Sequence, residues 1–321
     1  MAIEILETFY NDEAGETQER VACPLCGRSD EALVLLGRDL LFRRPGYYRL
    51  VRCRHCNLEY VNPRPTQAAL GVHYPSDYFG YALHEDAPKL LTPLLQSYAL
   101  GISKRRLAYL EKVTGPVQPA QQLLDVGCGV NRLLAHVQQA RGCEGLGLDF
   151  KPEIVAHVRR TLGMPIVEGT LSSAGFESGR FDTVFMMEYL EHEADPLALL
   201  QEARRITRSG GYLALELPHI ASLPGRLFRS LWWNLDVPRH LVFPAPKTVG
   251  PLLARAGFEL QSVKTFTLPF YVGMSVLQVL GQRHWRKHKD AFPVLSALLG
   301  APFLPFQALL PEFMFVVAKA I

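Results

Sequence analysis

Four of the six cysteines form two pairs whose spacing is typical of a metal site. The first pair, Cys23 and Cys26, lies in CPLCG, and the second pair, Cys53 and Cys56, follows after 26 residues in CRHC. Two residues between cysteines allow both thiolates to face one ion, and a second such pair completes a tetrahedral zinc shell. Because four sulfur ligands leave no open position, we predict a zinc ribbon whose Zn²⁺ is structural rather than catalytic.

The residues between the pairs support this interpretation. RRPGYYRLVR, residues 43–52, predicts a hairpin whose second strand delivers the second cysteine pair. Metal binding worth about 10–16 kcal/mol would then supply the folding energy of this small module. The alternatives are cysteines that are merely buried and a redox dithiol. A redox motif needs a thioredoxin-like context, which this sequence does not show.

A second stretch, LLDVGCGVNRLLAHV at residues 123–137, predicts a strand, a glycine turn and a helix. Dinucleotide-binding turns read G-x-G-x-x-G and hold a pyrophosphate at the helix N-terminus. Here Asp125 precedes the first glycine by two residues, and a carboxylate at that place would repel a pyrophosphate. Asp149 ends the next apolar stretch, 20 residues after Gly129, where an acidic side chain can bind a ribose diol. The combination favours S-adenosylmethionine (SAM) over NAD.

Each residue of this turn has a predicted role toward SAM. Asp125 would meet the methionine ammonium, and Gly127 and Gly129 would let the backbone approach the ligand closely. Asp149 would accept hydrogen bonds from the ribose hydroxyls. Asn131 stands where a third glycine is expected, and asparagine tolerates left-handed backbone better than most residues. Its side chain either weakens SAM binding or adds a hydrogen bond, and both interpretations stay open.

The next segment, SGRFDTVFMMEYLEHEADPLALLQEARRITRSGGYLALELPH, resembles the signature of class I SAM-dependent methyltransferases, and the resemblance covers about residues 120–267. It implies the α/β class, with a Rossmann-like seven-stranded methyltransferase sheet. Phe150, which follows the ribose acid, would cover the adenine edge. The family also contacts adenine from the loop after the third strand, which here implies Thr170 and Leu171. That loop lacks the usual acidic residue, so a backbone amide would have to bind the base.

Two further residues are assigned to the cofactor site, each with a structural alternative. Cys128 lies inside the glycine turn, although a small core residue is its simpler interpretation. Glu188 ends an apolar strand, and it either contacts the ligand or begins the following helix.

The residues after the second cysteine pair indicate which group of methyltransferases the sequence resembles. LEYVNPRP and LGVHYPSDYFGY precede the glycine turn, and they resemble the zinc-ribbon methyltransferases of sugar and polysaccharide biosynthesis, including deoxysugar C-methyltransferases. This resemblance implies a sugar or a lipid-linked glycan intermediate as the methyl acceptor. It also implies that His240, in PRHLVFP, is a candidate general base by analogy of position.

Methyl transfer from a sulfonium requires mainly that the acceptor be positioned and deprotonated. An imidazole suits proton removal near neutral pH. His192 and His240 follow the predicted fourth and fifth strands on the ligand-bearing edge, so both are catalytic candidates, with helix capping and loop packing as alternatives. Arg239 would bind an acceptor phosphate or carboxylate, or lie in solvent. Three tyrosines either line the acceptor pocket or simply pack: Tyr74, Tyr78 and Tyr81.

Composition and charge describe an ordinary globular protein. Of the 321 residues, 48% are hydrophobic and 20% are charged, and the net charge is +3. The first 20 residues are acidic and lack the apolar core of a signal peptide, so we expect a cytoplasmic protein. Four parts are predicted: an acidic segment (1–20), the zinc ribbon (21–87), a connecting helix and linker (88–118) and the methyltransferase domain (119–321).

A hydrophobic insertion, residues 268–311, precedes the last predicted strand. Residues 291–311 carry no charge, but Pro293, Pro302 and Pro305 would interrupt a membrane-spanning helix. Because four Arg or Lys residues lie in 283–290, we hypothesise that 283–311 contacts a membrane or accommodates a lipid-linked acceptor. A lid or a dimer contact is the alternative, and the oligomeric state stays open. The strand that follows should return to the sheet beside the fifth strand.

Two other functions compete with the small-molecule methyltransferase. The first is an RNA methyltransferase whose ribbon arginines bind phosphates: Arg43, Arg44, Arg49, Arg52 and Arg54. A net charge of +3 is small for an RNA-binding protein, so a nucleic-acid partner is not favoured. The second is a scaffold that binds SAM without turnover, for which Asn131 is the only support in the sequence.

Overall fold

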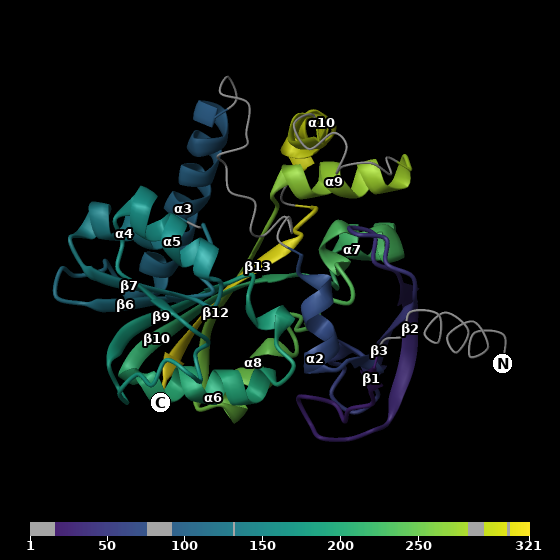
Figure 1. The fold of residues 1–321 in the computed structure, drawn as a ribbon, viewed down its shortest axis with the longest axis horizontal. Coiled ribbons are helices and arrows are strands. Elements are labelled where there is room, and N and C mark those ends of the chain that lie inside the picture. Colours follow the sequence, from purple (N-terminus) through teal and green to yellow (C-terminus); the bar gives the residue numbers. More distant parts are fainter. Residues whose placement is uncertain (1–16, 76–91, 131, 282–291, 307–308) are drawn as a thin grey trace.

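The computed structural model describes residues 17–75, 92–130, 132–281, 292–306 and 309–321 (Figure 1). A large sheet covered by helices lies beside a smaller N-terminal sheet. Several predictions fall outside the described residues: those on Asn131, Tyr78, Tyr81, residues 1–16 of the acidic segment and the basic residues of 283–290.

The described residues form a seven-stranded sheet in the order β12-β13-β10-β9-β6-β7-β8. Its strands are β6 (Gln122–Val126), β7 (Glu144–Asp149), β8 (Ile166–Glu168), β9 (Phe181–Met187), β10 (Thr207–Pro218), β12 (Phe258–Phe266) and β13 (Phe313–Ala320). The pairs from β10 to β8 are parallel, whereas β13 runs antiparallel to both of its neighbours. The predicted α/β sheet is confirmed, as is the return of the last strand beside the fifth strand, β10.

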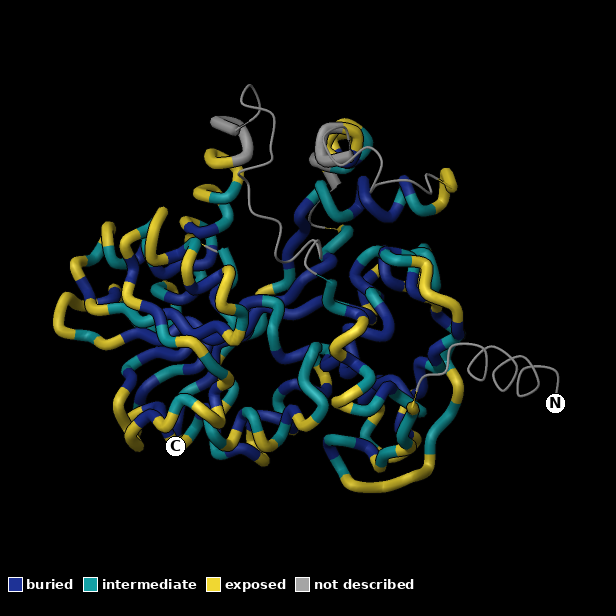
Figure 2. Tube along the Cα trace, viewed as in Figure 1, coloured by how far each residue is buried: buried dark blue, intermediate teal, exposed yellow. Residues whose placement is uncertain are grey.

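Helices cover both faces of this sheet (Figure 1). One face carries α3 (Thr92–Thr114), α4 (Leu133–Arg141) and α5 (Pro152–Leu162), and the other carries α6 (Pro196–Ile206) and α8 (Val249–Arg255). Local sequence sets their limits: Asp195 accepts the Ala198 N–H at the start of α6, and Gly142 ends α4 with φ +70°. The central strands β9 and β13 and the second half of β10 are almost continuously buried between these layers (Figure 2).

The smaller sheet is antiparallel, and its described strands follow the order β11-β4-β3-β2. β2 (Glu31–Gly37) and β3 (Tyr48–Cys53) form a hairpin, and β4 (Glu59–Val61) follows. The predicted second strand that leads into the second cysteine pair is confirmed as β3, whereas the first strand, β2, lies before the predicted range 43–52. The outer strand, β11 (Val242–Phe243), comes from the methyltransferase segment and places Val242 opposite Tyr60. Short elements complete this region: β1 (Gln18–Glu19), β5 (Arg64–Pro65), α2 (Gln67–Leu70) and η1 (Gly71–His73).

The two sheets share one hydrophobic core. Cys23, Leu25 and Tyr60 of the ribbon belong to the same buried cluster as Leu200 of α6 and Leu252 of α8. A second cluster packs Tyr48 and Leu50 of the ribbon against Trp232, so among the described residues both ribbon clusters include side chains from later in the chain. The division of the chain at residues 87 and 118 stays a prediction, but packing is continuous between the ribbon and the large sheet.

The hydrophobic insertion contributes α9 (Pro269–Val279), α10 (Phe292–Gly300) and the 3₁₀ helix η8 (Ala301–Phe306). Near α9 lie α7 (Leu223–Phe228), η5 (Arg229–Leu231) and η6 (Trp233–Leu235), and Figure 1 shows α9 and α10 stacked beyond one end of the large sheet. In the described ranges, no helix has both the length and the apolarity needed to cross a bilayer.

Candidate functional site

The four predicted cysteine ligands come together. Their Sγ atoms all lie within 4.8 Å of one another, with 3.4 Å between Cys23 and Cys56 and 3.5 Å between Cys26 and Cys53. Tetrahedral zinc with Zn–S bonds of about 2.3 Å requires sulfur atoms about 3.8 Å apart. The cluster therefore fits a Zn²⁺ ion with four sulfur ligands.

The backbone explains why each pair faces the same point. Gly27 and Asn57, one residue after each pair, have φ +74° and +63°. Their N–H groups donate to the carbonyl oxygens of Cys23 and Cys53, at 2.8 and 3.0 Å. Glycine and asparagine are the residue types that adopt this left-handed conformation readily. The two turns thus have the same geometry.

The predicted cofactor edge begins at Asp125 near the end of β6. This side chain is 1% exposed, and neither carboxylate oxygen has a hydrogen-bond partner among the described residues. Burial raises the pKa of Asp125 to about 7, with Arg106 lowering it and Asp149 raising it further. A buried carboxylate without a partner is costly unless a ligand satisfies it. A cationic group such as the methionine ammonium fits this position.

The glycine turn follows directly. Gly127 and Gly129 have φ +64° and +48°, and a Cβ on Gly127 would lie 2.1 Å from Cδ2 of Tyr189. Asp149 accepts the Gly129 N–H at 3.0 Å through Oδ2 and the Lys151 N–H at 3.0 Å through Oδ1. Asp149 is therefore both the predicted ribose ligand and the residue that holds the turn to β7.

The residues predicted on the adenine side differ in exposure. Phe150 is 48% exposed at the end of β7, so its ring is accessible to a planar ligand. Thr170 is exposed and its hydroxyl hydrogen-bonds with Ser172 and Ser173. Leu171 and Cys128 are each 1% exposed and pack in the hydrophobic core. Any contact of these last two with a ligand would therefore be made by their backbone.

Glu188 lies in a charged cluster that the sequence analysis missed. It follows β9 with φ +55°, and its carboxylate is 3.5 Å from Arg106 of α3 and 3.5 Å from the Tyr271 hydroxyl of α9. Arg106 also donates to the buried Glu216 of β10, at 2.9 Å from its Nε. Burial, and then the Glu216 charge, raises the pKa of Glu188 to about 7. Arg106 thus connects α3 to the ends of two adjacent strands.

The structure brings the two predicted catalytic histidines together. The rings of His192 and His240 lie 4.5 Å apart and are nearly perpendicular. Tyr74, from the predicted ribbon region, hydrogen-bonds to His192 Nδ1 at 2.9 Å. Burial lowers the pKa of each histidine to about 3. Both imidazoles are therefore neutral at physiological pH, and each is a weak proton acceptor. The general-base role stays a prediction.

Arg239 differs from its sequence-based interpretation. We expected it to bind an acceptor or to lie in solvent, but its side chain is fully buried and ion-paired. Its Nη2 is 2.8 Å from Asp39 of the ribbon and 2.6 Å from Asp236. The two carboxylates occupy the guanidinium, so Arg239 joins the ribbon to the loop that carries His240.

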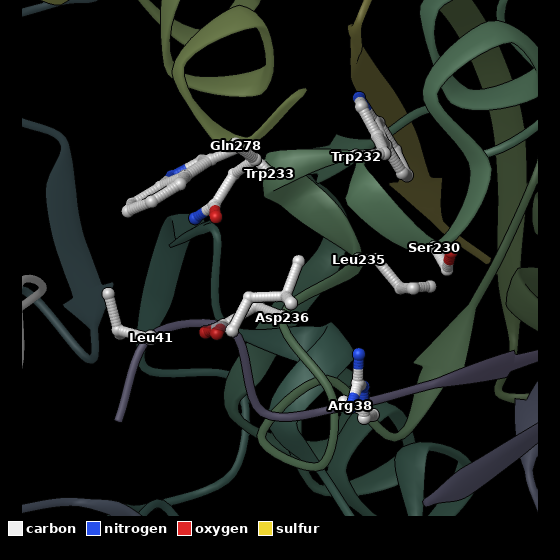
Figure 3. A pocket seen from close by; sticks show the side chains of 9 residues that line it. Arg38, Leu41, Ser230, Trp232, Trp233, Leu235, Asp236 and Gln278 are labelled. Atoms are coloured by element: carbon white, nitrogen blue, oxygen red, sulfur yellow. The ribbon is translucent and has the colours of Figure 1, made fainter. Parts of the chain in front are cut away.

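A small pocket lies where the ribbon, η6 and α9 meet. Figure 3 shows Arg38 and Leu41 of the ribbon on one side, and Trp233 and Gln278 on the other. Its lining includes none of the predicted catalytic or cofactor-binding residues. The pocket therefore lies outside the predicted SAM edge.

Comparison with known proteins adds three findings. A family model described as a methyltransferase domain matches residues 86–263, more than half of the chain. An uncharacterized 37.1 kDa protein in transposon TN4556 of Streptomyces fradiae is 31% identical over 208 residues, which are 61% of this chain and 60% of that protein. A ubiquinone biosynthesis O-methyltransferase of Xanthomonas campestris is 34% identical over 103 residues, 30% of this chain and 43% of that enzyme. The chain thus spans less than two thirds of these relatives.

A solved structure shares the fold. The Galdieria sulphuraria protein for which a sarcosine dimethylglycine methyltransferase role has been suggested aligns with a TM-score of 0.51 and 14% identity. The alignment covers 68% of this chain and 85% of that protein. At this identity the likeness concerns the arrangement of the sheet and its helices.

Proposed function

Because the chain belongs to the family of SAM-dependent methyltransferases, we propose that it methylates a hydroxyl of a sugar carried on a lipid. When bound, SAM would supply an activated methyl group to the acceptor hydroxyl, whose proton would pass to a base, with S-adenosylhomocysteine as the other product; His192 and His240 are the candidates for that base. The chain would hold SAM through Asp125, the glycine turn and Asp149. Its remaining tasks are to exclude water and to hold the acceptor in line.

A contact between α9 and the cofactor edge is the main support for a lipid-linked acceptor. The Tyr271 hydroxyl of α9 lies 3.5 Å from Glu188, so the hydrophobic insertion begins at the cofactor edge. The same helix ends in exposed apolar side chains, Val279 and Leu280, and α10 exposes Leu295 and Leu298. Apolar helices beside an active site suit an acceptor whose lipid part stays in a membrane surface. The name of the Xanthomonas relative, an O-methyltransferase, supports an oxygen acceptor.

The RNA alternative has less support. Arg52 is paired with Glu59 at 2.5 Å and Arg54 with Asp30 at 3.4 Å, so two of the five ribbon arginines already have carboxylate partners. The scaffold alternative rested on Asn131, which lies outside the described residues.

The test of this function uses labelled SAM and three acceptor sets: nucleotide sugars, polyprenyl-phosphate-linked glycans in anionic liposomes, and structured RNA. We expect label in the lipid-linked glycan, and co-sedimentation of the protein with the liposomes that Leu280→Glu weakens. The matched control is Ile321→Glu. Ile321 is about as exposed as Leu280 and lies at the end of the large sheet away from α9. Label only in RNA, or SAM binding without transfer to any set, would replace this proposal with an alternative.

Replacing Asp149 with alanine should weaken binding of S-adenosylhomocysteine by about 10- to 100-fold. Each lost hydrogen bond to a charged acceptor is worth about 1.5–3 kcal/mol, and the Gly129 turn also loses its anchor. Isothermal titration calorimetry measures the change. Asp182→Ala is the control, because Asp182 accepts a backbone N–H of Gln122 at the opposite end of the strands. Equal affinity in Asp149→Ala and wild type would remove Asp149 from the cofactor site.

Cofactor affinity should also depend on pH through Asp125. Burial raises the pKa of this carboxyl to about 7, so the ionised form that attracts an ammonium predominates above pH 7 and is lost below it. Affinity for S-adenosylhomocysteine should therefore fall as pH decreases below about 7, by at most about tenfold per pH unit for one proton. Asp125→Asn should bind more weakly and remove this step. The same pH profile in wild type and Asp125→Asn would contradict the assignment.

A further inference from the structure

A buried carboxylate and two imidazoles meet at the carboxyl end of β9. One oxygen of Glu191 and one nitrogen each of His192 and His240 lie within 4.8 Å of one another. Glu191 and His192 belong to η4 (Leu190–His192), and the Leu241 N–H donates to the Glu191 carbonyl at 2.7 Å. This backbone bond brings the residue after His240 against η4. The pairing of β11 with β4 begins at Val242, two residues after His240, and holds the same loop in place.

The hydrogen bonds of both imidazoles leave one ring nitrogen of each available. His240 Nδ1 lies 2.9 Å from the Asn234 carbonyl oxygen, and His192 Nδ1 lies 3.2 Å from the Arg239 carbonyl oxygen. A carbonyl oxygen can only accept, and the Tyr74 hydroxyl, 2.9 Å from His192 Nδ1, itself donates to the Arg239 carbonyl oxygen at 3.2 Å, so these contacts favour a proton on the Nδ1 atom of each ring. The Nε2 lone pairs are then free to bind a cation. Metal-ligating histidines are oriented by the same kind of bond from their other nitrogen.

Among the described residues, no hydrogen-bond partner explains the burial of the Glu191 carboxylate. Glu191 is 1% exposed, and within the described parts of the chain neither of its carboxylate oxygens has a hydrogen bond. A buried, unpaired carboxylate is destabilising unless a proton or a cation neutralises it. The two imidazole nitrogens beside it lie where they can supply the other ligands of a cation.

We propose that Glu191, His192 and His240 bind a divalent first-row transition-metal ion, separate from the zinc of the cysteine cluster. Two imidazoles and one carboxylate leave coordination positions open for oxygen ligands. A metal-bound hydroxyl loses its proton to water near neutral pH, so the acceptor would need no imidazole base. This role in acceptor binding rests on the proposed function, whereas the metal binding itself does not.

The experiment is a Co²⁺ titration of the full chain with its cysteine cluster loaded with zinc. We expect one Co²⁺ per chain, with the weak visible absorption of nitrogen and oxygen ligands and without the intense thiolate-to-cobalt band that zinc displacement would produce. Glu191→Gln should lower Co²⁺ affinity by more than about 100-fold, since even residues behind the ligands are worth about 10- to 100-fold. S-adenosylhomocysteine affinity, measured on the same samples, should stay unchanged.

The matched control is Glu312→Gln. Glu312 is also buried, and burial raises its pKa to about 8. It lies outside the Glu191–His192–His240 cluster, and one of its carboxylate oxygens accepts a hydrogen bond from Trp232 Nε1. The proposed site would be overturned if the zinc-loaded chain bound no Co²⁺ or bound it only through thiolates. It would also be overturned if the Glu191→Gln variant and the wild type bound Co²⁺ with equal affinity. Co²⁺ binding that leaves transfer to every acceptor unchanged would retain the metal site and reject its role in acceptor activation.

Discussion

Replacing Cys56 with serine should abolish zinc binding, unfold the ribbon sheet and reduce methyl transfer to background. Serine is a poor zinc ligand, and zinc bound by four cysteines supplies about 10–16 kcal/mol of folding free energy to such a module. Native mass spectrometry measures the metal, and circular dichroism with labelled SAM measures folding and turnover. The zinc content should fall from one ion per chain to none.

The expected loss of methyl transfer follows from the contacts that the ribbon makes with the two segments that carry His192 and His240. β4 pairs with β11, whose first residue is two positions after His240, and Tyr74 hydrogen-bonds to His192. Unfolding the ribbon removes both supports at once. S-adenosylhomocysteine binding should be affected far less, because Asp125, Gly129 and Asp149 are held by the large sheet. The variant should therefore separate cofactor binding from transfer.

Cys143→Ser is the matched control, since Cys143 is a buried free cysteine outside the cluster. It should keep its zinc ion and its activity. A Cys56→Ser protein with wild-type folding and turnover would show that the cluster is dispensable, and that the four cysteines are no more than buried thiols.

The parts of the site that could be predicted from sequence are those encoded by short spacing. The two C-x-x-C pairs, the D-x-G-x-G turn and Asp149 each depend on a few neighbouring residues, and the structure places each group together as expected. His192 and His240 were predicted on the same edge because both follow strands of a parallel sheet. Their direct contact, at 4.5 Å, depends on a loop path that no local pattern contains.

The parts that could not be predicted are contacts between distant segments. Arg106 and Glu216 are 110 residues apart, and Asp39 and Arg239 are 200 apart, so neither pair produces a local signal. The two residues of β11 are too few to show strand periodicity, yet they complete the ribbon sheet. Glu191 carries no signal in the sequence, because one glutamate beside a histidine has no spacing that marks it as a ligand. Only its burial without a hydrogen-bond partner in the described chain indicates a ligand.

Truncating Asp39 to alanine should lower the free energy of unfolding by about 1–3 kcal/mol. That range applies to buried hydrogen-bond donors that lose their acceptor, because Asp236 still compensates the charge of Arg239. Arg239 is 0% exposed, and its bonds to Asp39, at 2.8 and 3.1 Å, would be lost while Asp236 remains. Burial opposes ionisation of Asp39, but hydrogen bonds from His73 and Arg239 hold its pKa well below the usual range. Urea denaturation of the zinc-loaded chain measures the change.

An ion pair on the surface is the control that shows whether burial causes the loss of stability. Asp30 and Arg54 form an ion pair at 3.4 Å with side chains 56% and 63% exposed, and Asp30→Ala should change stability by less than about 1 kcal/mol. Asp39→Ala combined with Arg239→Met and Asp236→Ala should recover much of the lost stability, because the triple variant removes all three charges of the cluster. Recovered stability without recovered methyl transfer would mean that the pair holds the His240 loop in place. An Asp39→Ala protein as stable as wild type would show that Asp236 alone satisfies Arg239, and that the ribbon is held by β11 and the shared core instead.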